Sequence, residues 1–141
     1  MKKILSPRDK LPDVNPDSTT SIFNILSPFD NLLEVGIGSR MDVAHALSKN
    51  RIVFATDIYP CEVSEKIQFF IDDICNPTLE IYSNTEIIYA LNLPPELHQP
   101  LFNVASKVGS KCLFTTLGND FPEIPVQIET IPGETIYWAI N

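Results

Sequence analysis

A chain of 141 residues, 44% hydrophobic and 20% charged, has the size and composition of one globular domain with a substantial core. No apolar run is long enough to span a membrane, and the basic first residues lack the apolar segment of a secretion signal. We therefore expect a cytoplasmic protein with no membrane partner. The formal net charge of −8 repels phosphate backbones, so nucleic acid is a disfavoured partner.

The first part of the chain differs in character from the rest. Residues 1–16 contain three prolines among charged residues and show no hydrophobic periodicity, which predicts an irregular N-terminal arm. Residues 17–141 are then expected to form a single domain. A leading helix is predicted from an N-cap at Asp17 or Ser18 to a point before Pro28, because apolar residues recur there at helical spacing.

Beyond this helix, short apolar runs alternate with helical or loop connections, which is the pattern of a parallel sheet. The predicted strands are Leu32–Val35, Ile52–Thr56, Ile67–Ile71, Glu86–Leu91, Lys111–Thr116, Val126–Thr130 and Thr135–Ile140. The predicted helices are Arg40–Asn50, a brief one at about Cys61–Lys66, and Leu97–Val108 with Pro100 in its first turn, where the proline ring causes no clash.

The C-terminal strands are joined by a Pro132-Gly133 turn, and strands connected so tightly must be antiparallel. The sequence therefore predicts an α/β fold with a mostly parallel sheet and a C-terminal antiparallel hairpin. The connection Leu117–Pro125 is too short and proline-rich for a helix, so helices are reduced on one face. An uncovered apolar face usually marks an interface, which predicts a homodimer or a protein partner.

The cysteines and histidines form no pair or cluster at metal-ligand spacing. Cysteines this sparse are typical of reduced, partly buried thiols in an intracellular protein, and we expect no metal site. The residues concerned are Cys61, Cys75, Cys112, His45 and His98.

A strand, an acid and two glycines form the most informative motif, Glu34-Val35-Gly36-Ile37-Gly38. Gly36 and Gly38 allow a tight turn and remove side chains where a ligand needs room. About 20 residues further on, Asp57 ends the next strand, where a carboxylate can bind ribose hydroxyls. The ordinary alternative is a ligand-free turn and a solvent-facing acid.

These motifs, together with Ala55–Ile58, Asp72–Ile74 and Pro94–Leu97, resemble the class I S-adenosylmethionine-dependent methyltransferases. More narrowly, the chain is similar to a small uncharacterised archaeal family, uncharacterised protein family 0146, with a minimal form of that three-layer Rossmann-like fold. The resemblance implies S-adenosylmethionine as a possible cofactor and Glu34 near its amino group.

The resemblance also assigns the adenosyl end of the cofactor. Asp57 would bind the ribose, and Ile58 or Tyr59 would pack on the adenine. Asp72 or Asp73 would accept from the adenine amino group, and the backbone N–H of Ile74 would contact the ring. A helix cap or an Asx turn is the alternative reading of the two acids.

A dinucleotide-binding site is the competing interpretation of the glycine turn. It requires a third small residue where this chain has Met41, which weakens the nicotinamide hypothesis. A nicotinamide site also does not require the acid that Asp72 or Asp73 supplies.

The segment Asn92-Leu93-Pro94-Pro95 is similar to the turn with which amino-methylating enzymes orient their target nitrogen. Leu93 intervenes in that pattern, and Glu96 stands where an aromatic residue is expected. A rigid proline turn that opens a helix is the ordinary alternative. His98 is a candidate catalytic base beside it, or else a surface or capping residue.

The sequence therefore predicts an S-adenosylmethionine-binding, methyltransferase-like protein with an unknown methyl acceptor. The alternatives are a non-catalytic module that binds a nucleotide-like ligand or a partner, and a binder of a nicotinamide nucleotide. The candidate catalytic residues are Asn92 and His98, and the candidate cofactor-binding residues are Glu34, Gly36, Gly38, Asp57, Ile58, Asp72, Asp73 and Ile74.

Overall fold

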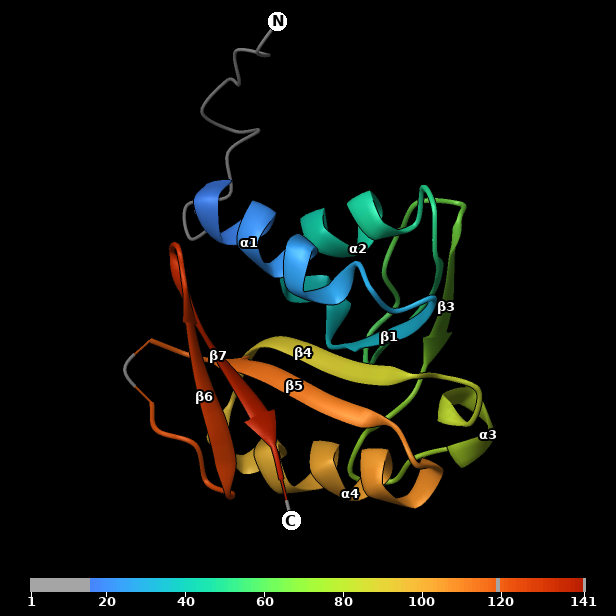
Figure 1. Cartoon of the computed structure of the whole chain (residues 1–141). Helices are drawn as coiled ribbons and strands as arrows, with labels where there is room; N and C mark the ends of the chain where they lie inside the picture. The colour runs from blue at the N-terminus through green and yellow to red at the C-terminus, as the bar shows by residue number, and fades with distance from the viewer. Residues whose placement is uncertain (1–15, 119, 141) are drawn as a thin grey trace, which may run out of the picture.

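The computed structural model describes residues 16–118 and 120–140, and the predicted arm lies outside this part apart from Pro16 (Figure 1). The helices are α1 (Pro16–Leu26), α2 (Asp42–Leu47), α3 (Leu79–Tyr82) and α4 (His98–Val108), with short 3-10 turns η2 (Ile37–Ser39) and η3 (Pro95–Leu97). The strands are β1 (Asn31–Val35), β2 (Ile52–Asp57), β3 (Ile67–Ile71), β4 (Ile87–Leu93), β5 (Lys111–Thr116), β6 (Val126–Ile131) and β7 (Glu134–Ala139).

All seven strands form one sheet in the order β3-β2-β1-β4-β5-β7-β6. Strands β1 to β5 are parallel, and β7 is antiparallel to both β5 and β6. This confirms the mostly parallel sheet with a C-terminal hairpin. The last residues of β1 to β5 form one edge of the sheet, which we call the carboxyl edge; their first residues form the amino edge.

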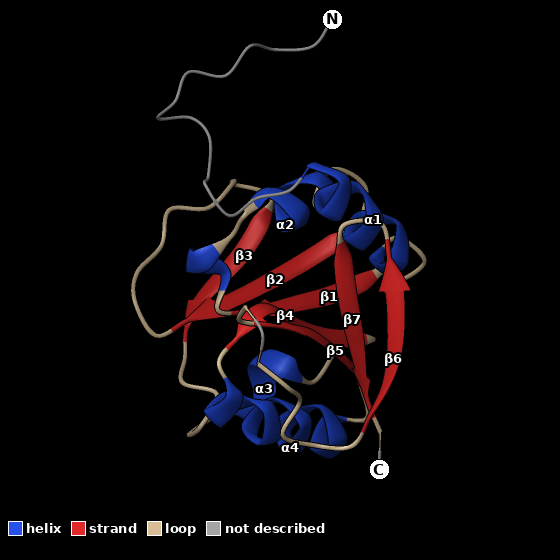
Figure 2. Cartoon of the chain, turned by 90° about the vertical axis from the view of Figure 1, so that its left-hand side faces the viewer, coloured by secondary structure: helices blue, strands red, loops and turns tan. Residues whose placement is uncertain are grey.

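Helices α1 and α2 cover one face of the sheet, and α3 and α4 cover the other (Figure 2). Successive residues of β1 alternate between two buried clusters, Leu32 beneath α1 and α2 and Leu33 beneath α4, as the period of a strand requires. Strand β4 lies at the centre, and six of its seven residues are buried. The buried central strand β4 therefore holds the middle of the carboxyl edge in place.

The helix predicted at Cys61–Lys66 is not formed, and these residues run as an irregular connection. Six residues make fewer than two turns, which is marginal without a packing face. Ile52 and Phe70 at the β2–β3 side of the sheet remain 52% and 38% exposed, consistent with the predicted reduced helix cover. Whether a second subunit covers them stays a prediction.

Among residues 16–118 and 120–140, no helix has the length and hydropathy needed to cross a membrane.

Candidate functional site

A cavity of about 470 Å³ opens at the carboxyl edge, between the ends of β1, β2, β3 and β4. Its wall is mostly apolar, with a few carboxylates and one side-chain amide. A concave apolar site with a few convergent polar groups at this edge of a parallel sheet is typical of ligand binding. The predicted site residues that line it are Gly36, Asp57, Ile58, Asp72, Asp73, Ile74 and Asn92.

The glycine turn begins at Gly36, whose φ of 75° is a conformation that favours glycine. A Cβ there would meet no atom within 4 Å, so the backbone faces open space in the cavity wall. Gly38 does not line the cavity. Its backbone N–H donates to Asp57 Oδ2 at 2.9 Å, and a Cβ would lie 2.8 Å from that same oxygen. Gly38 therefore permits the close approach of Asp57.

Asp57 is held by backbone donors on both sides. In addition to the Gly38 bond, its Oδ1 accepts from the N–H of Tyr59 at 3.1 Å. A carboxylate has about four acceptor positions, so each oxygen can still accept one further donor. The side chain is half-buried and fixed, with capacity left for two hydroxyl groups of a ligand.

The structure separates the two adjacent acids at the end of β3. Asp72 accepts from the Thr78 N–H with both oxygens at 3.2 Å and from the Tyr82 hydroxyl at 2.8 Å. It therefore anchors the start of α3. Asp73 accepts the backbone N–H of Cys75 through Oδ1 at 2.8 Å, and the Cys75 thiol lies within hydrogen-bonding reach of the same carboxylate. Both acids line the cavity, and Asp73 has more unused acceptor capacity.

Glu34 is fully buried and does not line the cavity. Desolvation raises its pKa to about 8, partly offset by the nearby Tyr89 hydroxyl. Neither carboxylate oxygen forms a hydrogen bond of normal geometry with the described residues. The structure places Glu34 beneath α1 and α2, close to Tyr89, and outside the cavity wall. Its predicted place beside the amino group of a cofactor stays a prediction.

A buried arginine supports the glycine turn, and the sequence analysis missed it. Arg40 is 3% exposed; its Nε donates to Asp42 Oδ1 at 2.8 Å, and its Nη2 donates to Thr19 Oγ1 at 2.9 Å. Although burial opposes it, the hydrogen bonds from Arg40 and Thr19 lower the pKa of Asp42. The available signal was an arginine two residues after Gly38 and two residues before Asp42.

Asn92 lies at the carboxyl end of β4 and lines the cavity. Its φ of 56° is the only positive value outside glycine among the described residues. The β4–β5 register shifts between Ala90 and Leu93, and the Asn92 N–H donates to Thr115 Oγ1 at 2.8 Å. A local irregularity that re-aims a side chain is common next to functional sites.

His98 is fully buried at the start of α4 and does not line the cavity. Its Nδ1 accepts from the Glu123 N–H at 3.1 Å, which leaves Nε2 as the donor to the Leu93 carbonyl oxygen, also at 3.1 Å. The ring also packs on Phe114, with 4.4 Å between centroids. Both nitrogens are engaged, so this geometry suits a positioning residue that joins the β4 turn to the loop after β5.

Replacing His98 by Ala is expected to destabilise the protein by about 2 to 4 kcal/mol, because a buried ring and two hydrogen bonds are lost. Denaturant unfolding of the variant measures this. His45→Ala is the control, since His45 is exposed on α2 and its loss should change stability by at most about 0.5 kcal/mol. A loss below about 1 kcal/mol for His98→Ala would contradict the positioning role.

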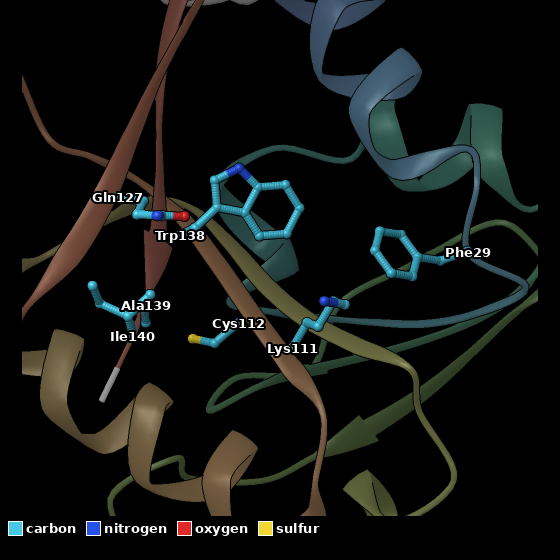
Figure 3. A pocket seen from close by; sticks show the side chains of 7 residues that line it. All are labelled: Phe29, Lys111, Cys112, Gln127, Trp138, Ala139 and Ile140. Atoms are coloured by element: carbon cyan, nitrogen blue, oxygen red, sulfur yellow. The ribbon is translucent and has the colours of Figure 1, made fainter.

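A second cavity, of about 350 Å³, lies near the amino edge of β5 and contains none of the predicted site residues. Figure 3 shows the rings of Phe29 and Trp138 on two sides of it, with the Lys111 side chain at its wall. It is distant in the fold from the carboxyl edge, because β5 begins at Lys111 and ends at Thr116.

The sheet order and the reversed β7 define the fold of class I methyltransferases, and solved structures agree. A TehB-like methyltransferase from Corynebacterium glutamicum gives a TM-score of 0.61 at 14% identity, covering 89% of this chain and 88% of its own. An RNA methyltransferase from Salinibacter ruber, solved with S-adenosylhomocysteine, gives 0.56 at 15% identity over 92% of each chain. At this identity the likeness shows the fold alone.

The family model named uncharacterised protein family UPF0146 matches residues 18–140. A relative of that family from the archaeon Halobacterium salinarum is 42% identical over 103 residues, which are 72% of this chain and 80% of the relative. The chain therefore belongs to the UPF0146 family, as the sequence motifs implied.

Proposed function

We propose that this protein binds S-adenosylmethionine at the carboxyl-edge cavity and acts as a small methyltransferase. The observation that carries the proposal is the convergence of Gly36, Asp57 and Asp73 on one cavity, each from the end of a different strand. The solved neighbour with S-adenosylhomocysteine bound has the same fold, which supports this choice of ligand.

The cavity residues fit the parts of such a ligand. Asp57 has two acceptor positions left for the ribose hydroxyls, and the Asp73 carboxylate has acceptor capacity beyond Cys75 for the adenine amino group. Ile58 and Tyr59, both on the wall and largely exposed, can cover a flat ring. The open backbone at Gly36 leaves room for the methionyl end. When bound, S-adenosylmethionine supplies an activated methyl group.

On the acceptor side, we assign Asn92 as the residue that orients the group to be methylated. Asn92 lines the cavity and has a left-handed backbone conformation, with φ of 56°. Orientation of this kind can contribute several powers of ten to a rate. His98 is assigned a positioning role, since it reaches the Leu93 carbonyl beside Asn92.

A non-catalytic binding module is the second candidate. It is favoured by one observation: in the part of the chain that the structure describes, the cavity wall carries no histidine, lysine or cysteine that could serve as a base. Binding of S-adenosylmethionine without turnover on a broad set of acceptors would favour this candidate.

Ligand-induced stabilisation tests the proposal. S-adenosylmethionine and S-adenosylhomocysteine should raise Tm, while NAD and ATP should not, and a ligand at 100 times its Kd adds about 2.7 kcal/mol. The four ligands are compared by thermal unfolding of the full chain. A shift with NAD alone, or with none of the four, would reject S-adenosylmethionine as the ligand.

A further inference from the structure

The cavity of about 350 Å³ near the amino edge of β5 lies where β5 and β7 separate. Pairing between the two strands ends at Leu113 and Trp138. Past that pair, the N–H of Ile140 donates to the Pro125 carbonyl oxygen at 3.1 Å, which holds the end of the chain on the β6 side. The residues beyond the last pair therefore line a gap in the sheet, and its volume is in the range of small-molecule sites.

Two aromatic rings face this cavity from different parts of the chain (Figure 3). Phe29 follows α1 and Trp138 lies on β7, and both are half-buried against the core beneath α1 and α2. The Trp138 indole Nε1 donates to Glu129 Oε1 at 2.9 Å, and the Phe29 N–H donates to the Leu26 carbonyl oxygen at 3.1 Å. Rings held in place on two sides of a cavity suit a planar aromatic ligand and lose little freedom when it binds.

Lys111 adds a positive charge to the same wall. It lies two residues before Leu113 on β5, so it shares the sheet face of Leu113 and is a diagonal neighbour of Trp138. Within the described residues its ammonium group makes no ion pair. Gln127, which pairs with Trp138 across the hairpin, also lines the cavity. An ammonium and a side-chain amide are donors for a ligand carboxylate.

The surroundings of the cavity limit the charge of its ligand. Lys111 is the one cation of the wall in the described part of the chain, and burial raises the pKa of the Cys112 thiol to about 12, so that this thiol stays neutral. Acids lie close by: Glu129 accepts from the indole, Glu86 accepts backbone N–H groups at the start of β1, and Asp30 is exposed next to the Phe29 position. A dianion would carry a second charge that no cation of the wall matches.

We propose that this cavity is a second binding site, which takes a planar aromatic monocarboxylate with its ring between Phe29 and Trp138 and its carboxylate on Lys111. The site is independent of the proposed function, because its lining residues are all different from those of the carboxyl-edge cavity.

The test follows the indole N–H signal of Trp138 in proton–nitrogen correlation NMR spectra of the full chain, which has one tryptophan. The probes are 2-naphthoate, its neutral amide, the non-planar decahydro-2-naphthoate, and 2-naphthyl phosphate. The naphthoate should shift the signal saturably and bind more tightly than the other three. Lys111→Met should weaken naphthoate binding by roughly three- to tenfold and should not weaken binding of the amide. The control Lys66→Met removes an exposed cation just before β3 and should have no effect.

A saturable shift that depends on both the planar ring and Lys111 supports the second site. Equal affinity for the planar and non-planar acids, equal affinity of wild type and Lys111→Met, tighter binding of the phosphate, or no saturable shift would overturn it. S-adenosylhomocysteine should not compete with the naphthoate, and competition would place the naphthoate in the wrong cavity and so count against the proposal. Failure to bind S-adenosylmethionine would reject the proposed function alone.

Discussion

Replacing Asp57 by Asn should weaken binding of S-adenosylmethionine by about 100-fold or more, because two hydrogen bonds to a charged acceptor become bonds to a neutral one. The substitution preserves the size of a side chain that lines the cavity and contacts the Gly38 and Tyr59 N–H groups. Asn keeps one acceptor oxygen, so the turn should remain folded. Isothermal titration calorimetry at a temperature where the variant is folded gives the two Kd values.

The matched control is Asp30→Asn, which makes the same chemical change on an exposed acid just before β1 at the amino edge. It should leave the affinity unchanged, which separates local contacts from loss of overall negative charge. An Asp57→Asn protein that binds as tightly as the wild type would show that the ribose of the ligand is not held here.

The free energy of unfolding of the wild type should decrease as the pH rises from 5 to 8. Replacing Glu34 by Gln should remove most of this decrease. The pKa of Glu34 is about 8 in the folded protein, raised from 4.5 by burial. Between these values the folded state holds a proton that the unfolded state has released. Stability therefore falls as pH rises, by up to about 1.4 kcal/mol per pH unit. Below pH 4.5 both states are protonated and the full stability is present.

Urea unfolding of wild type and Glu34→Gln at several pH values measures this. From pH 5 to pH 8, the free energy of unfolding of the variant should rise by about 3 kcal/mol relative to that of the wild type. The histidines titrate in both proteins, so their contributions cancel in this difference. Glu65→Gln is the control, because Glu65 is exposed and should leave the pH dependence unchanged. Parallel pH profiles for wild type and Glu34→Gln would show that Glu34 ionises normally in the folded protein.

The strands could be predicted closely because each is a short apolar run with its own turn signals. Ile67–Ile71 and Lys111–Thr116 have the predicted bounds. The predicted helix Arg40–Asn50 is shorter, Asp42–Leu47, since the chain first makes a 3-10 turn and then extends at Arg40 (φ −166°). Hydrophobic periodicity does not report such a turn. Helix α3 has four residues, too few for any periodic signal.

The candidate site was predictable where a residue ends a strand, as at Asp57 and Asp73, because the ends of parallel strands meet at one edge. It was less predictable where burial decides the role. Glu34 and His98 are polar residues that alternation alone cannot assign to the cavity or to the core. The partner of His98 is the N–H of Glu123, 25 residues away, a contact that only the fold brings together.

The position of the hairpin has a consequence for synthesis on the ribosome. Strand β6 joins the sheet only through β7, and α1 contacts both, with Ser18 Oγ donating to Glu134 Oε1 at 2.9 Å. The first helix therefore emerges more than a hundred residues before its partner exists. The apolar face of this helix, which includes Ile22 and Leu26, remains partly exposed until β7 has been synthesised. The surface of α1 that faces the hairpin is therefore the last part of this core to be covered during synthesis.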